Sequence, residues 1–140
     1  KSAARISGGN LKTAIRVAHD TENSTRDKAF ELMALAAKSK SLEHLNHVLN
    51  HKDNTDALLD MLAYLGVIAN DLVNIHYAPD EVTNFDRTDF LKGISHASIP
   101  DRVPDYLLLL DDFSRKVDGN VNPSLIRINL FIATKNLLTP

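Results

Sequence analysis

The chain of 140 residues is long enough for one domain with a hydrophobic core of its own. Hydrophobic residues make up 44% and charged residues 24%, with five Gly and five Pro, a globular composition that argues against collagen and low-complexity disorder. The lack of Cys excludes disulfides, thiolate zinc sites, iron–sulfur clusters and cysteine nucleophiles. The net charge of −2 provides no general attraction to nucleic acid or to an anionic membrane.

The sequence carries no recognisable targeting signal. No apolar run approaches the roughly 20 residues that span a bilayer, and the first residues, KSAARISGG, lack the apolar stretch of a signal peptide. We therefore expect a cytoplasmic protein that makes no contact with a membrane. Because the first residue is Lys1 rather than Met, we expect the chain to be a segment of a longer protein.

Charge is distributed unevenly along the chain. Residues 1–40 carry eight basic and four acidic side chains, net +4, whereas residues 41–140 carry eight basic and fourteen acidic ones, net −6. The polar stretch DTENS, residues 20–24, is typical of a turn and lies near this change. It predicts a domain boundary there.

Apolar residues recur at spacings of three and four, which predicts an all-α fold. A first helix is expected over residues 11–19, after the turn Gly8-Gly9-Asn10. Ser24 and Asp27 form a capping box that predicts a helix to residue 38. Its apolar face would contain Phe30, Met33, Ala34 and Ala37. A shorter helix is expected over residues 42–51.

The longest predicted helix covers residues 55–77 and is apolar around most of its circumference, which indicates a central helix contacted from several sides. Gly66 within it predicts a close crossing by another helix.

Three shorter helices are expected after this central one. The turn Asn84-Phe85-Asp86 is predicted to cap a short helix over residues 87–92. Pro104 predicts the start of a helix over 104–117. The last helix, 123–138, has a narrow polar side, so we expect it to be buried in the domain or in an oligomer interface.

The densest group of potential metal ligands is His44, His47 and His51, which share one face of the predicted helix 42–51. Three imidazoles on one face are able to hold zinc or nickel. Their neighbours include Asn and Lys rather than the carboxylates that usually orient such ligands, so we favour a solvated polar face. Adjacent carboxylates such as Asp111 and Asp112 point about 100° apart on a helix and make no acid–base pair. No catalytic residue, metal site or cofactor site is assigned.

Three stretches together resemble the C-terminal part of sliding-clamp-loader AAA+ subunits, most closely the delta-prime type of bacterial DNA polymerase III. ARISGGNLKTAIRVAHD is similar to the last helices of the AAA+ lid. LGVIANDLVNIHY, followed by Asn84-Phe85-Asp86, is similar to the long collar helix and its Asn-x-Asp turn. GNVNPSLIRINLFIATKNLL resembles the final collar helix, which Asn-x-Asn-x-x-Leu introduces. That pattern is matched by Asn120, Val121, Asn122 and Leu125.

The resemblance implies that residues 1–22 are the end of an AAA+ lid and that residues 23–140 form an all-α helical collar, an oligomerisation domain. Such a collar would join the gamma/tau and delta subunits in a ring. It would meet DNA and the sliding clamp only through the whole complex, whose parent enzyme is a nucleotidyltransferase. Lys12 occupies the position often held by the sensor-2 arginine, which suits a subunit that does not hydrolyse ATP.

Periodicity places the expected subunit interface on the last helix, around residues 125–137, and on the long central helix, and the resemblance adds the two asparagines that precede the last helix. The expected interface residues are Leu125, Ile128, Phe131, Ile132, Asn120 and Asn122. Three alternatives remain open. They are the collar of a gamma/tau or small clamp-loader subunit, a stand-alone metal-dependent helical enzyme that uses His44, His47 and His51, and a DNA-binding helical regulator.

Overall fold

A computed structural model describes residues 22–38, 55–119 and 121–140. This part of the chain is helical and contains no strand, which confirms the all-α fold class. The α-helices are α3 (Glu22–Lys38), α5 (Thr55–Tyr77), α6 (Thr88–Ile94), α7 (Ile99–Asp118) and α8 (Pro123–Leu138). Two 3₁₀ turns, η1 (Pro79–Glu81) and η2 (Phe85–Arg87), connect α5 to α6.

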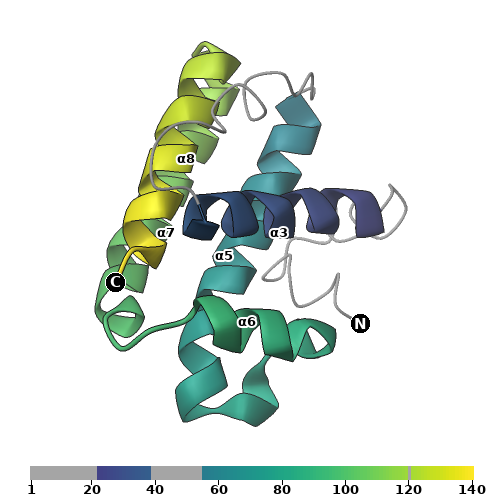
Figure 1. Cartoon of the computed structure of the whole chain (residues 1–140). Coiled ribbons are helices and arrows are strands. Elements are labelled where there is room, and N and C mark those ends of the chain that lie inside the picture. Colours follow the sequence, from purple (N-terminus) through teal and green to yellow (C-terminus); the bar gives the residue numbers. More distant parts are fainter. Residues whose placement is uncertain (1–21, 39–54, 120) are drawn as a thin grey trace.

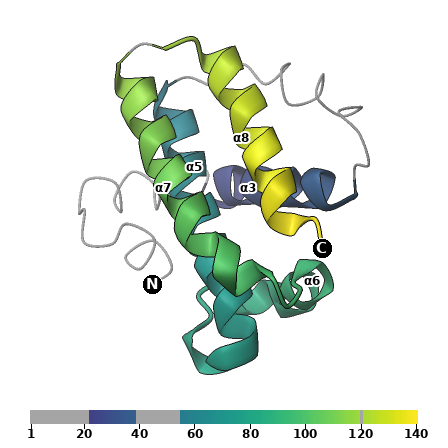
Figure 2. The ribbon, with the colours of Figure 1, turned by 90° about the vertical axis from the view of Figure 1, so that its left-hand side faces the viewer.

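The core surrounds α5, which packs against α3, α6 and α7. α7 and α8 lie side by side and run in opposite directions, while α3 crosses α5 and also contacts α8 (Figures 1 and 2). The largest fully buried side chains come from every one of these helices and include Met33, Tyr64, Leu91, Ile99 and Phe131. The described helices therefore enclose one continuous apolar core.

By length and composition alone, α5 could cross a bilayer. It was not identified from the sequence, because charged residues interrupt its apolar run. In the structure, 61% of its most apolar window is buried inside the domain. Burial of this kind is typical of the central helix of a globular bundle, which is the role predicted for residues 55–77.

The buried face of α3 differs by one position from the predicted one. Ala36 is buried and Ala37 is exposed, while Phe30 and Met33 are buried as predicted. Because α3 contacts both α5 and α8, its buried face is wider than a single stripe and is centred between the two neighbours.

α7 begins five residues before the predicted start at Pro104. Its first turn contains Pro100, and Pro104 lies inside the helix, where it removes the N–H that would bond to the carbonyl of Pro100. Ile99 and Val103 are buried on the same face as Tyr106. Burial of these two side chains favours the longer helix in spite of the proline.

Gly66 lies where α5 meets α7, but the two helices are not unusually close there. A Cβ added at Gly66 would lie 3.8 Å from both Leu107 and Leu110, which is ordinary van der Waals contact. The helix crossing was predicted correctly. The crossing is not close enough to require glycine, so the predicted close approach was wrong.

The predicted helices 11–19 and 42–51 lie outside the described residues, and so does the proposed lid remnant apart from the start of α3. The predicted domain boundary between residues 22 and 23 falls in the first turn of α3. The division into two domains stays a prediction.

Candidate functional site

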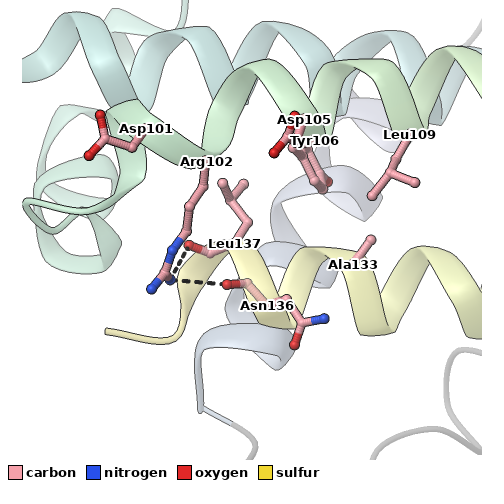
Figure 3. A pocket seen from close by; sticks show the side chains of 8 residues that line it. All are labelled: Asp101, Arg102, Asp105, Tyr106, Leu109, Ala133, Asn136 and Leu137. Atoms are coloured by element: carbon pink, nitrogen blue, oxygen red, sulfur yellow. Dashed lines mark hydrogen bonds between the residues drawn. The ribbon is translucent and has the colours of Figure 1, made fainter.

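A groove of about 290 Å³ runs between α7 and α8 on the surface of the bundle. Apolar side chains reach into it from both helices: Tyr106 and Leu109 from α7, and Ala133 and Leu137 from α8 (Figure 3). Polar residues form its border, namely Asp101, Arg102, Asp105 and Asn136. The groove therefore combines an apolar floor with a polar, partly charged rim.

Arg102 closes one end of the groove by capping the last turn of α8. Its Nη1 donates to the carbonyls of Asn136 at 3.1 Å and Leu137 at 3.4 Å, and also to the carbonyl of Thr139 (Figure 3). Carbonyls at a helix C-terminus lack intrahelical donors and carry partial negative charge. The charge of Arg102 is thus directed at the end of α8.

The floor of the groove is fixed by a buried hydrogen-bonded pair. Thr134 Oγ1 donates to the carbonyl of Leu130 at 2.8 Å, so the hydroxyl of Tyr106 donates to Thr134 Oγ1, also at 2.8 Å. Burial raises the pKa of the Tyr106 hydroxyl well above its usual value of 10.0. Tyr106 is therefore a neutral structural donor that fixes α7 against α8.

The outward side of α8 is apolar along most of its length and carries one charged residue, the half-buried Lys135, near its C-terminal end. Leu125 and Ile132 are 50% and 38% exposed, and Ile128 is half-buried beside them. Spacings of three and four put these three side chains, the outer stripe of α8, on one side of the helix. The exposed residues of α8 are Pro123, Ser124, Leu125, Asn129, Ile132 and Asn136. Arg127, one of two charged residues in α8, is buried on the inner side.

The expected interface residues divide between this outer side and other roles. Leu125, Ile128 and Ile132 form the outer stripe, whereas Phe131 is fully buried in the core. Asn122 is the N-cap of α8, where its side chain accepts a hydrogen bond from the amide of Ser124 at 2.9 Å. Asn120 lies outside the described residues. Phe131 is therefore removed from the proposed interface, because reaching a neighbour would require unpacking the core.

The turn Asn84-Phe85-Asp86 does not cap α6 by a side chain, contrary to the sequence prediction. Asn84 is buried, and both its backbone amide and its Nδ2 donate to Asp71 Oδ2 on α5, at 2.9 and 2.7 Å. The amide of Thr83 donates to the other carboxyl oxygen of Asp71 at 2.8 Å. These long-range bonds hold the loop on α5, a role that the spacing within the turn does not reveal.

α3 is attached to the same loop by charged groups. The guanidinium of Arg26 donates to Asp86 through two nitrogens, at 2.9 and 2.6 Å, and to Asn84 Oδ1 at 3.3 Å. The hydrogen bond from Arg26 lowers the pKa of Asp86 below its usual 3.8. Arg87 donates to Asp27 at 2.7 Å, and both guanidinium groups lie over the ring of Phe30. This polar network is structural, because each member pairs with another.

A histidine and a serine that the sequence did not connect lie together at the end of α5. His76 Nε2 lies 2.8 Å from Ser95 Oγ, which also donates to the carbonyl of Leu72 at 3.1 Å. With the serine proton directed at that carbonyl, the imidazole is the donor of the pair and not a base for the serine. Within the described residues no carboxylate bonds to the second ring nitrogen of His76. The pair ties the segment after α6 to α5.

His44, His47 and His51 lie outside the described residues. Among the residues that the structure describes, no three His, Asp or Glu side chains gather in a way that would hold a metal ion. The metal-site hypothesis therefore stays an untested prediction about residues 44–51.

Comparisons with protein-family models, with curated proteins and with solved structures found no match to this chain.

Proposed function

We propose that this chain is the subunit-assembly collar of a bacterial sliding-clamp loader, of the delta-prime type. The observation that carries the proposal is the outer stripe of α8, an apolar line that reaches the surface and meets one charged residue, Lys135, only at its C-terminal end. The cores of protein interfaces are depleted of charged residues. Apolar side chains exposed only to water add nothing to the stability of the fold, whereas the same side chains covered by a neighbouring subunit favour assembly.

The helical architecture supports the same proposal. A long central helix, a pinned Asn-x-Asp turn and a final helix capped by Asn122 occur in the order that the resemblance implies. In this role the domain holds subunits together, and DNA, the clamp and ATP are handled elsewhere in the complex. Residues 1–22, with Lys12, would be the end of the lid. A cytoplasmic location follows from this function.

The three alternatives differ from the proposal in the residues that each of them requires. The collar of a gamma/tau or small clamp-loader subunit would use the same outer stripe, and the delta-prime choice depends on Lys12. The metal-dependent enzyme depends on His44, His47 and His51, and no observation on the described residues favours it. The DNA-binding regulator would need a basic face, and the outward side of α8 has a single basic residue, Lys135.

The proposal is tested by mixing the chain with the gamma/tau and delta subunits encoded with it and measuring the mass of the product by light scattering after size exclusion. We expect a stable complex. The double variant Leu125→Glu/Ile132→Glu should weaken assembly at least about 100-fold, because each unpaired carboxylate buried in the interface costs several kcal/mol.

Leu108→Glu is the matched control, because Leu108 is 68% exposed and lies on the side of α7 opposite its buried face. It should assemble as the unaltered chain does. A chain that stays monomeric with all partner subunits present, or a double variant that assembles normally, would overturn the proposal. Tight binding of duplex DNA by the isolated chain would favour the regulator instead.

A further inference from the structure

We infer that the groove between α7 and α8 receives an arginine side chain from the subunit that covers the outer stripe of α8. The inference rests on the proposed function, since that subunit supplies the arginine. It concerns a different surface, however, because the groove borders the stripe on the α7 side and is lined by both helices.

The size of the groove suits one long side chain. Its volume of about 290 Å³ is at the lower limit of the roughly 300–1,000 Å³ found for small-molecule pockets. The floor contains Leu109, which is 43% exposed, together with Ala133 and Leu137. A floor of this kind covers the aliphatic part of an arginine while its charged end stays at the rim.

The rim is negative where the floor ends. Asp101 and Asp105 are both exposed and are four residues apart on α7, so they lie on the same side of the helix. In the described part of the chain neither carboxylate takes part in an ion pair, whereas Asp111 and Asp112 farther along α7 pair with Arg115 and Lys116. Two unpaired carboxylates beside an apolar floor favour a cationic occupant.

The positive charge already present in the groove does not satisfy these carboxylates. Arg102 Nη1 is occupied by the carbonyls at the end of α8, including those of Asn136 and Leu137. Its charge therefore offsets the negative end of the α8 dipole. The rim keeps the charge of Asp101 and Asp105, and the side-chain amide of Asn136 adds a neutral acceptor on the opposite side.

Arginine fits this site better than lysine. A guanidinium is planar and weakly hydrated, and it binds a carboxylate through two parallel hydrogen bonds while its face lies on apolar groups. An ammonium is a compact and strongly hydrated charge, which loses more hydration on entering a groove with an apolar floor. Arginine is also enriched at protein interfaces, whereas lysine is depleted.

The groove is tested on the isolated 140-residue chain, without any partner subunit. The probe is the capped tripeptide acetyl-Ala-Arg-Ala-amide, titrated while NMR follows the methyl groups of Leu109 and Ala133 and the side-chain amide of Asn136. We expect shifts confined to these groups with a dissociation constant of about 1 mM, as befits a single side chain. The citrulline peptide, which has the same shape without the charge, should bind at least about fivefold more weakly.

Two variants locate the binding. Asp105→Asn should weaken arginine binding about fivefold, and Asp118→Asn is the control that removes the same charge from the exposed far end of α7. Ala133→Leu fills the floor without a change of charge and should abolish the shifts. Equal binding of the arginine and citrulline peptides, an unaffected Asp105→Asn variant, or no shifts at the groove would overturn the inference.

The assembly experiment separates this inference from the proposed function. If the subunits assemble but Asp105→Asn and Ala133→Leu assemble as well as the unaltered chain, the groove inference is wrong and the collar proposal stands. If no assembly occurs, the collar proposal fails, and the peptide titration alone decides whether the groove binds arginine.

Discussion

Replacing Asp71 with alanine removes the acceptor of three hydrogen bonds that hold residues 83–84 against α5. The carboxyl of Asp71 is 1% exposed and accepts from the amide of Thr83 and from both donors of Asn84. Thr83 is half-buried, so water can replace its lost partner, whereas Asn84 is buried and its two donors stay unsatisfied.

The magnitude follows from those two donors. Each buried unsatisfied donor costs about 1–3 kcal/mol. Part of this loss is offset because a buried carboxyl no longer has to be desolvated. We therefore expect Asp71→Ala to lower the free energy of unfolding by about 2–4 kcal/mol.

Urea unfolding at pH 7, followed by circular dichroism, measures this loss. With a denaturant slope of about 2 kcal/mol per molar urea, the midpoint should fall by about 1–2 M. Asn70→Ala is the control, because Asn70 is the exposed neighbour of Asp71 on the same helix and its loss should change stability by less than about 0.5 kcal/mol. If the two variants unfold at the same urea concentration, the loop is not held by Asp71 and the account of the turn is wrong.

Three further predictions test other parts of the bundle. In urea unfolding, Thr134→Val should lower the free energy of unfolding by about 1 kcal/mol more than Tyr106→Phe does. The first leaves the buried tyrosine hydroxyl without an acceptor, whereas the second leaves Thr134 still bonded to the backbone. Because Arg26 lowers the pKa of Asp86, this pair stabilises the fold above the unfolded-state pKa and the contribution is lost as pH falls through the lower folded-state value. The stability difference between the unaltered chain and Asp86→Asn should therefore shrink as pH falls below about 4, the usual pKa of an aspartate, and a difference that stays constant through this range would contradict the assignment. Gly66→Ala should raise the free energy of unfolding by about 0.4–1 kcal/mol, and with it the melting temperature, since the added Cβ meets α7 at ordinary contact distance.

The helices were predictable from the sequence because their signals are local. The helices predicted over residues 55–77 and 123–138 begin and end in the structure at the predicted residues. The apolar periodicity ends at these points at a capping residue or next to a proline. Pro104 gave a wrong helix start because this local signal was outweighed by burial of Ile99 and Val103 against the core. Such tertiary compensation cannot be detected within a window of one helix.

The site was predictable only in part, for a reason that α8 makes clear. On α8, Leu125 and Ile132 lie on one side and Leu130 on the adjacent one, and because both sides are apolar in the sequence, no polar residue indicates which of them faces solvent. Burial of Leu130 and Phe131 decides this. The groove and the bonds of Asp71 escaped prediction because each joins residues that are distant in sequence.

The outer stripe and the groove together define what a partner of this domain must look like. The outer stripe of α8 is apolar, whereas the adjacent edge of α7 has unpaired carboxylates at Asp101 and Asp105. Apolar contact is nearly proportional to buried area and is non-directional, so the stripe contributes affinity but tolerates sliding along the helix. A shift by one helical turn, about 5.4 Å, toward Leu109 would move an arginine out of reach of both carboxylates, whereas a shift the other way would bring it from Asp105 to Asp101. The stripe is therefore expected to determine how tightly the partner binds, and the two carboxylates to limit its register to two positions one turn apart.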